Sequence, residues 1–288
     1  MGSKISSIKN LIIVTTTLAA VLGIFSSTII PYAFAFELST PNKNSQVQWW
    51  KWILGIPAED SPVLDETGED CDVDQKGPIW YLAGFAGSSE EGGGGSADRD
   101  CTIPEGKDIL IPIFNTVCAE QTDAGLIKQE LGLEEDEEIP PSQLKEGLIR
   151  CTDFIMSFVT TLQFSIDGEE VEEEDFDDFR VVSPQFQIVY PEGNVFNQSP
   201  TDVKQKAVAQ GYWILIEDLE PGEHTIEVVS GLPDFNFETS VTYHLTIEPK
   251  QESSLSDEET NPVLSKLMTE KAQPPDDDIS VINKLMRK

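Results

Sequence analysis

The chain has 288 residues and carries 52 Asp and Glu against 19 Lys and Arg, which gives a formal net charge of −33 at pH 7. Nucleic-acid backbones and anionic membranes are bound by clustered Lys and Arg, so this composition excludes nonspecific nucleic-acid binding and disfavours a role on a membrane surface. The acidic excess favours a solvated surface, divalent cations or basic partners, and the length allows one large domain or two small ones.

The N-terminus has the pattern of an export signal. Lys4 and Lys9 precede an apolar stretch from Leu11 to Ile30, and Ala33-Phe34-Ala35 then offers a small-x-small cleavage site. This predicts a signal peptide over residues 1–35. The apolar stretch is also long enough to span a bilayer, so a retained N-terminal anchor is the alternative and the only predicted membrane contact. In both cases the rest of the chain is extracellular or in the cell envelope.

The four cysteines fit this compartment, because an even number of cysteines in an exported protein favours disulfides. Four cysteines allow three pairings, and the sequence does not choose among them. We prefer the sequential pairing of Cys71 with Cys101 and of Cys118 with Cys151. Each pair would close a loop of about 30 residues and stabilise the fold by roughly 3–4 kcal/mol. A four-thiolate metal site is disfavoured because the chain has no C-x-x-C pair.

Three tryptophans, Trp49, Trp50 and Trp52, lie close together in the segment Phe36–Leu54. One interpretation is a surface that stacks on sugars or binds a partner. The other is a part of the core that packs against a sheet. Both interpretations stay open at this point.

The turn-rich segment that follows gathers four carboxylates, those of Asp65, Asp70, Asp72 and Asp74. Hard oxygen ligands on a loop suit Ca²⁺, so these residues are the candidate calcium site, and no other cofactor is predicted. The spacing of the last three residues begins like an EF-hand loop. Gln75 stands where that loop needs Gly, so the segment is not an EF-hand.

Short strands and one helical insert are predicted next. Ile79–Gly84 and Ile109–Phe114 are apolar runs typical of strands, and Pro112 in the second run indicates an edge or a bulge. Residues 119–150 change to helical spacing and contain an acidic run, which predicts an insert of one or two short helices. Alternating apolar and polar residues over Phe154–Ile166 predict a half-buried antiparallel strand.

The rest of the chain continues with strands and turns. Asp167-Gly168 is a tight-turn signal, and the acidic run from Asp167 to Asp178 is interpreted as a solvated loop. Further strands are predicted over 186–190, 212–216, 225–229 and 240–247. The predicted fold is mainly β, an antiparallel β-sandwich (Ig-like or jelly-roll-like) stabilised by disulfides, over residues 36–249 with the insert at 119–150. Residues 250–288 predict a disordered acidic tail.

Few arrangements of residues suggest catalysis. The two histidines, His224 and His244, fall on opposite faces of one predicted hairpin, so they do not share a metal. A Gly-x-Ser-x-Gly turn is lacking, and carboxylates are so abundant that no single pair of them indicates hydrolysis. Asn197-Gln198-Ser199 is the sole glycosylation sequon, and Pro200 after it lowers its use.

Several separated motifs resemble a set of uncharacterised secreted proteins of archaea and bacteria. The resemblance covers residues 46 to 248 without the acidic insert. The set has no established activity, so the resemblance implies an exported globular domain and carries over no catalytic residue. The motifs are Asp65-x-Thr67-Gly68-x-x-Cys71, Gln75-x-Gly77-Pro78-x-Trp80-Tyr81-Leu82-Ala83-Gly84, Cys101-Thr102-Ile103-Pro104-x-Gly106-Lys107 and Pro221-Gly222-Glu223-His224-Thr225-Ile226.

These observations favour an exported, non-enzymatic protein that binds an extracellular or envelope protein or a glycan, or that forms part of a surface. Two alternatives come from other classes. One is a secreted hydrolase of polysaccharide or peptide that uses the aspartates of the candidate calcium site. The other is a calcium-dependent carbohydrate-binding module that uses the tryptophans.

Overall fold

The computed structural model describes residues 36–87, 94–196, 198–200 and 203–250. The predicted signal peptide and the predicted tail from residue 251 onward therefore lie outside the described residues. Among the residues described, no helix is long and apolar enough to cross a membrane. The fold is mainly β, with two sheets and two disulfides.

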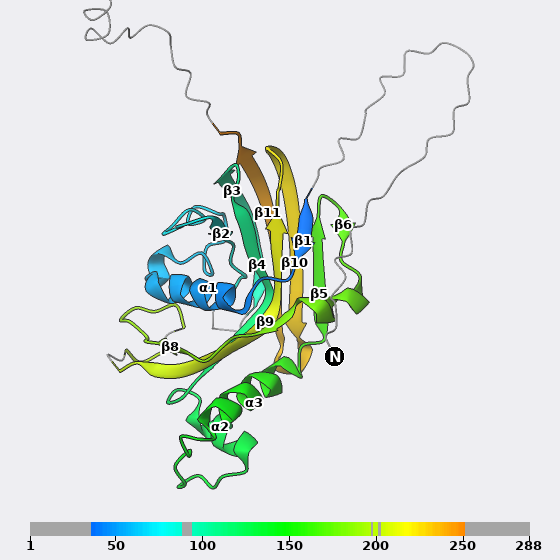
Figure 1. The fold of residues 1–288 in the computed structure, drawn as a ribbon. Helices are drawn as coiled ribbons and strands as arrows, with labels where there is room; N and C mark the ends of the chain where they lie inside the picture. Colours follow the sequence, from blue (N-terminus) through cyan, green and yellow to red (C-terminus); the bar gives the residue numbers. More distant parts are fainter. Residues whose placement is uncertain (1–35, 88–93, 197, 201–202, 251–288) are drawn as a thin grey trace, which may run out of the picture. The chain divides into compact units, whose positions relative to one another are not determined.

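The first sheet is built around two long strands, β4 (Asp108–Ala119) and β9 (Gln205–Glu217), which pair antiparallel (Figure 1). β2 (Ile79–Tyr81) pairs with the free side of β4. Three short strands follow one another along the other side of β9, namely β1 (Glu37–Ser39), β7 (Arg180–Val182) and β8 (Phe186–Ile188). The pairing of β4 with β9 shifts register between Pro112 and Phe114, which confirms the predicted irregularity at Pro112.

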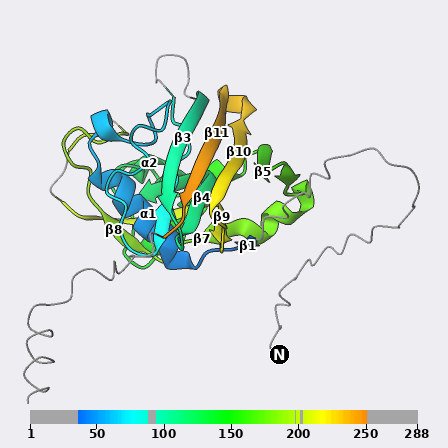
Figure 2. The ribbon, with the colours of Figure 1, turned by 90° about the horizontal axis from the view of Figure 1, so that it is seen from above.

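The second sheet has the order β3-β11-β10-β5-β6. Seen from above in Figure 2, β3, β11, β10 and β5 lie side by side in this order. The strands are β3 (Gly95–Pro104), β5 (Thr161–Ile166), β6 (Glu169–Glu170), β10 (Gly222–Leu232) and β11 (Phe237–Glu248).

Both sheets are mixed, which corrects the prediction of purely antiparallel sheets. β2 runs parallel to β4, and β3 runs parallel to β11. β3 ends at Pro104 and β11 begins at Phe237, so the two strands lie far apart in the sequence. Hydrophobic alternation shows which face of a strand is buried but not which strand is its neighbour, so the sequence did not reveal these pairs.

One face of each sheet contributes to the larger hydrophobic core. Ile109 and Ile111 of β4 meet Ile226 and Val228 of β10 there, and each of the four is at most 3% exposed. β9 is buried on both sides, as predicted for residues 212–216, because Ile214 joins this core while Trp213 joins a second core on the opposite face.

Helix α1 (Lys43–Gly55) covers that opposite face of the first sheet and carries the three tryptophans. Trp49, Trp50 and Trp52 are only 2%, 3% and 8% exposed. The ring of Trp49 lies edge-on to Trp213 of β9, with 5.3 Å between centroids. This burial against the sheet favours the interpretation of the tryptophans as part of the core.

Two helices form the insert, α2 (Ala124–Leu131) and α3 (Leu144–Met156), within and just beyond the predicted range. They pack closely, because a Cβ on Gly147 would lie 2.7 Å from the Cγ2 of Ile127. The disulfide from Cys118 on β4 to Cys151 fixes α3 to the first sheet.

The prediction of a strand over Phe154–Ile166 is wrong in its first half, where α3 continues to Met156 and a turn follows. Phe154 and Phe158 are four residues apart, a spacing that fits both the helical and the strand period. Their rings contact edge-on at 5.0 Å between centroids. The first part of the pattern therefore belongs to a helix and the turn after it, and the strand covers only Thr161–Ile166.

Candidate functional site

The irregular connection between α1 and β3 contains the candidate calcium residues. We call residues 61–85 the disulfide loop, because Cys71 within it is bonded to Cys101 on β3, which is the pairing preferred from the sequence. Gly68 lets the loop lie directly against β3. Its φ is +94°, and a Cβ there would lie 2.2 Å from the carbonyl oxygen of Asp100, so a larger residue would clash and be strained.

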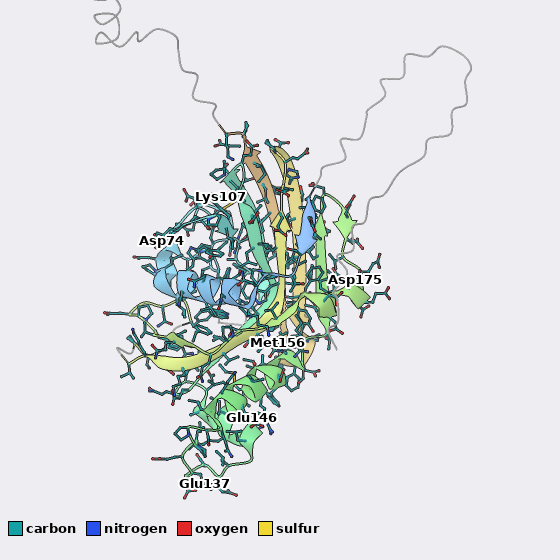
Figure 3. All side chains as sticks on the ribbon, in the orientation of Figure 1. Asp74, Lys107, Glu137, Glu146, Met156 and Asp175 are labelled. Carbon is teal, nitrogen blue, oxygen red and sulfur yellow. A yellow bond between two sulfur atoms is a disulfide. The ribbon has the colours of Figure 1, made fainter. Side chains whose placement is uncertain are left out.

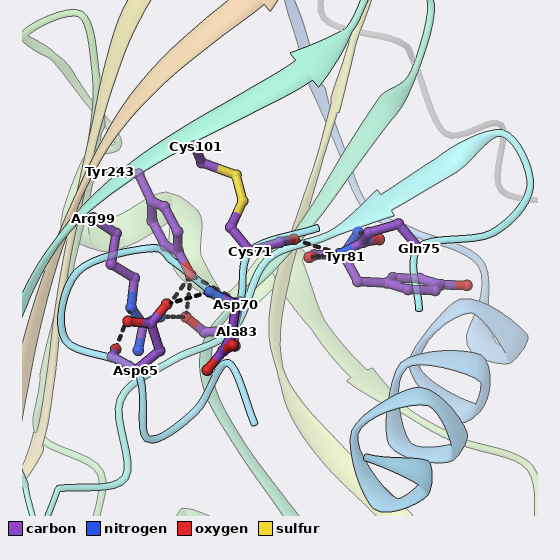
Figure 4. Close-up of a disulfide and its surroundings, with 9 residues drawn as sticks. All are labelled: Asp65, Asp70, Cys71, Gln75, Tyr81, Ala83, Arg99, Cys101 and Tyr243. Atoms are coloured by element: carbon purple, nitrogen blue, oxygen red, sulfur yellow. Dashed lines mark hydrogen bonds between the residues drawn. A yellow bond between two sulfur atoms is a disulfide. The ribbon is translucent and has the colours of Figure 1, made fainter. Parts of the chain in front are cut away.

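Arg99 of β3 holds this loop from inside the core (Figure 4). It is 1% exposed, and its Nε donates to the C=O of Asp65 at 2.8 Å. Its Nη1 donates to the C=O of Ala83 at 2.8 Å and to the hydroxyl of Tyr243 at 2.6 Å. Across the described residues no carboxylate pairs with it. A buried charge needs satisfied hydrogen bonds, so Arg99 and the loop backbone stabilise each other.

Asp65 organises the turn that follows it. One carboxylate oxygen accepts from the backbone N–H of Thr67 at 2.7 Å and from its hydroxyl at 3.0 Å, and the other accepts from the N–H of Asp70 at 3.0 Å. Burial alone would raise the pKa of Asp65. The backbone N–H groups of Asp70, Thr67 and Gly68 outweigh burial and hold that pKa below its usual value.

Gln75 acts as a second brace within the disulfide loop. Its side-chain amide donates to the C=O of Tyr81 at 2.8 Å and accepts from the N–H of the same residue at 2.9 Å. It also donates to the C=O of Cys71 at 3.1 Å. The residue that breaks the EF-hand pattern thus has a structural role of its own.

The other candidate calcium residues are not gathered around a common point. Asp74 forms an exposed ion pair with Lys76 at 3.0 Å. Burial, followed by the charges of Asp65 and Asp60, raises the pKa of Asp70. In the described part of the chain, no three His, Cys, Asp or Glu side chains lie together as a metal-binding group. Calcium binding at Asp65, Asp70, Asp72 and Asp74 stays a prediction.

The two histidines point to opposite sides of the β10–β11 hairpin, as their positions in the sequence indicate. His224 is 2% exposed, with Nδ1 2.7 Å from Asp167 and Nε2 2.9 Å from the C=O of Glu220. His244 is exposed and lies 2.8 Å from Asp98.

A groove beside β5 is the second candidate site. It has a volume of about 760 Å³ and lies between the β5 strand and the chain that follows β6. Asp167 and Gly168 make the predicted turn, with φ of 53° and 80°. β6 then pairs with only two residues of β5 before the chain leaves the sheet. We call residues 167–179 the acidic segment and this space the acidic groove.

Phe176 fixes the acidic segment to the body of the protein. It lies in a turn of 3₁₀ helix, η3 (Glu173–Phe179), is 3% exposed and joins the larger core. Val171 packs partly against the same core, and its N–H donates to the C=O of Phe164 at 3.0 Å. The interpretation of the run from Asp167 to Asp178 as a solvated loop is therefore incomplete, because Val171 and Phe176 anchor the run to the core.

The carboxylates of the acidic groove remain exposed. The lining residues include Glu170, Glu172, Glu173, Glu174, Asp177 and Glu227, and no Lys, Arg or His. Within the described residues no hydrogen bond or ion pair engages the side chains at 172–174. Figure 3 shows Asp175, beside them on η3, turned outward and far from Glu137 in the loop between α2 and α3. The groove is thus a concentrated negative surface with a fixed wall.

Comparison with known proteins gives no functional assignment. No protein-family model matches the chain, and no curated protein matches it. A solved structure, that of PbICP-C in complex with falcipain-2, aligns with 58% of this chain and 98% of its own at 9% identity and a TM-score of 0.20. That similarity is too low to support an argument about fold or partners. Asn197 of the predicted sequon lies outside the described residues.

Proposed function

We propose that this chain is an exported, non-enzymatic β-sandwich protein, extracellular or held in the cell envelope, that acts by binding a partner or as a surface component. The two disulfides support export, since such bonds persist in oxidising compartments. Two sheets that share one core support the sandwich architecture.

The acidic groove is the observation that carries the binding role. Exposed carboxylates that no described Lys, Arg or His pairs with, on a wall fixed by Phe176, offer a preformed negative surface. Complementary charge steers association and selects partners. The net charge of −33 extends the same field over the whole protein, so the partner is expected to carry positive charge where it meets this surface.

Chemical cross-linking on intact native cells, followed by mass spectrometry of the adducts, tests this function. Reproducible links to one envelope or extracellular protein are expected. Recovery of the protein from the medium without a linked partner would contradict the proposal. It would favour a free secreted enzyme or a binding module for small ligands instead.

A secreted hydrolase is a second candidate because of one observation in the disulfide loop. The environment there lowers the pKa of Asp65 and raises the pKa of Asp70, and carboxylates tuned in opposite directions are typical of acid–base catalysis. Both oxygens of Asp65 are already engaged by the loop backbone, which favours a structural role. Loss of polysaccharide or peptide hydrolysis in Asp70→Asn would support the hydrolase.

A further inference from the structure

We propose that the acidic groove binds an extended, lysine- or arginine-bearing segment of a partner protein, which adds to the open edge of β5 as a further strand. The inference rests on the proposed function and names the site and the chemistry of the partner. Two independent observations carry it, an unpaired strand edge and the charge of the wall that faces that edge.

β5 has one complete neighbour and one short neighbour. It pairs with β10 through all six residues from Thr161 to Ile166, whereas β6 covers only Ser165 and Ile166. The N–H of Val171 also donates to the C=O of Phe164 at 3.0 Å, so the edge without a strand partner among the described residues runs from Thr161 to Gln163. An exposed edge presents unpaired N–H and C=O groups, which are a template for pairing with another strand.

The direction of the backbone groups along this edge follows from the pairing. The N–H of Asp167 donates to the C=O of Thr225 on the β10 side, and alternate residues of an antiparallel strand face alternate neighbours. Leu162 and Phe164 therefore turn their backbone groups to the open side. The C=O of Phe164 accepts the N–H of Val171 there, while the backbone of Leu162 faces the groove. An added strand would pair with the N–H and C=O of Leu162.

The charges that border the edge select a cationic strand. Glu172, Glu173 and Glu174 line the groove from the acidic segment, and the exposed Glu227 lines it from β10. Successive side chains of an extended segment alternate in direction, about 3.3 Å apart along the strand. Lys or Arg at alternate positions would therefore meet one wall repeatedly. A second copy of this chain is disfavoured as the occupant, because two chains of charge −33 repel each other.

Fluorescence anisotropy with the full chain tests the proposal, using a labelled octapeptide of alternating lysine and threonine as the probe. The groove variant combines Glu172→Gln, Glu173→Gln and Glu174→Gln. The control variant combines Glu135→Gln, Asp136→Asn and Glu138→Gln, which remove equal charge from an exposed loop outside the groove. A third arm uses the same octapeptide with alternate backbone nitrogens methylated, which removes donors that strand pairing needs while keeping the charge.

We expect saturable binding that weakens about tenfold or more in the groove variant and with the methylated peptide, while the control variant stays within about twofold of the wild type. If binding weakens equally in both variants, the effect comes from net charge alone, and the groove is not the binding site.

If the methylated peptide binds as well as the unmodified one, the peptide does not bind by strand addition. A partner that still cross-links to the groove variant on cells would also overturn the groove while leaving the proposed function intact, and absence of any partner would remove the function itself.

Discussion

The disulfide loop and the acidic segment are both irregular and rich in carboxylates, but different interactions attach them to the rest of the protein. In the disulfide loop, both carboxylate oxygens of Asp65 accept hydrogen bonds from the loop backbone. Arg99 and the Cys71–Cys101 disulfide attach the loop to β3. In the acidic segment, the buried ring of Phe176 anchors η3 to the core, and only Asp167, at the start of the segment, accepts a backbone hydrogen bond among the described carboxylates there, from the N–H of Thr225. The carboxylates at 172–174 engage no other described group.

This difference separates structural acids from available ones. A carboxylate that accepts several backbone hydrogen bonds stabilises its own turn and is expensive to redirect to a ligand. A carboxylate exposed on an anchored wall needs little rearrangement to meet a cation. The sequence shows two acidic clusters, and only the structure assigns them different roles.

The largest predicted loss of stability is that of Arg99→Met, which removes the buried side chain that holds the disulfide loop. The substitution would leave the backbone C=O of Asp65 without its buried donor and would remove the hydrogen bonds to the C=O of Ala83 and the hydroxyl of Tyr243, which keep their hydrogen bond to each other. We expect the free energy of unfolding to fall by roughly 4 kcal/mol, summed from about 1–3 kcal/mol for the orphaned C=O of Asp65 and about 0.5–1.5 kcal/mol for each of the two other lost hydrogen bonds. Urea unfolding measures it. Unchanged stability would mean that the free energy gained by no longer burying the charged guanidinium offsets the loss of its hydrogen bonds.

Phe176→Ala tests the acidic segment in the matching way. Removing this buried ring should lower the free energy of unfolding by roughly 3 kcal/mol and leave a cavity under η3. Hydrogen exchange should rise over residues 171–179 and stay unchanged over the disulfide loop. Exchange that rises in both regions together would show that the two regions do not open separately.

Replacing both Cys71 and Cys101 by Ala removes the disulfide that attaches the disulfide loop to β3, a bond that the acidic segment does not have. Loop entropy predicts a loss of about 3–4 kcal/mol for a sequence separation of 30 residues. The Cys118/Cys151 double variant, with a separation of 33 residues, is the matched control of almost equal entropy. Limited proteolysis should cleave the disulfide loop only in the first variant, and cleavage of both variants at that loop would argue against local anchorage.

Asp65→Ala should destabilise the fold by about 1–2 kcal/mol at pH 7, the range for loss of a capping side chain. Because the folded state lowers the pKa of Asp65, the ionised group contributes stability above its unfolded pKa of about 3.9. That contribution disappears as the pH falls through the lower folded pKa. Thermal unfolding of both proteins should therefore converge below about pH 4, and a constant gap would show that ionisation of Asp65 is irrelevant.

The groove variant at residues 172–174 should have the smallest effect on stability, within about 0.5 kcal/mol, because these side chains are exposed and pair with none of the described residues. Differential scanning calorimetry measures the change. A loss larger than that would show that the carboxylates hold the acidic segment in place and would make any binding defect ambiguous.

Local chemistry accounts for what the sequence predicted well. Cys71 and Cys101 pair as preferred, Asp167-Gly168 forms the tight turn, and Pro112 marks the bulge in β4. Each of these depends on a few adjacent residues or on one covalent preference. Such features can be identified without knowledge of the partner strands.

The missed features depend on distant partners. β3 reads as polar and was not predicted as a strand, because one of its core positions is occupied by Arg99, whose hydrogen-bond acceptors lie elsewhere in the chain. Helix α1 carries tryptophans that fit either a surface or a core until Trp213 is known to lie beneath them. The groove was missed for the same reason, although Val171 and Phe176 were the available signal that the acidic segment is anchored.

Zero-length carboxyl-to-amine cross-linking on native cells, with the linked peptides mapped on this chain, tests the central claim most directly. We predict that links to the partner's lysines concentrate at Glu172, Glu173, Glu174 and Asp177. Links that concentrate instead at Asp70, Asp72 and Asp74, or that spread evenly over the exposed carboxylates including Glu135 and Glu138, would contradict the assignment of the acidic groove as the binding surface.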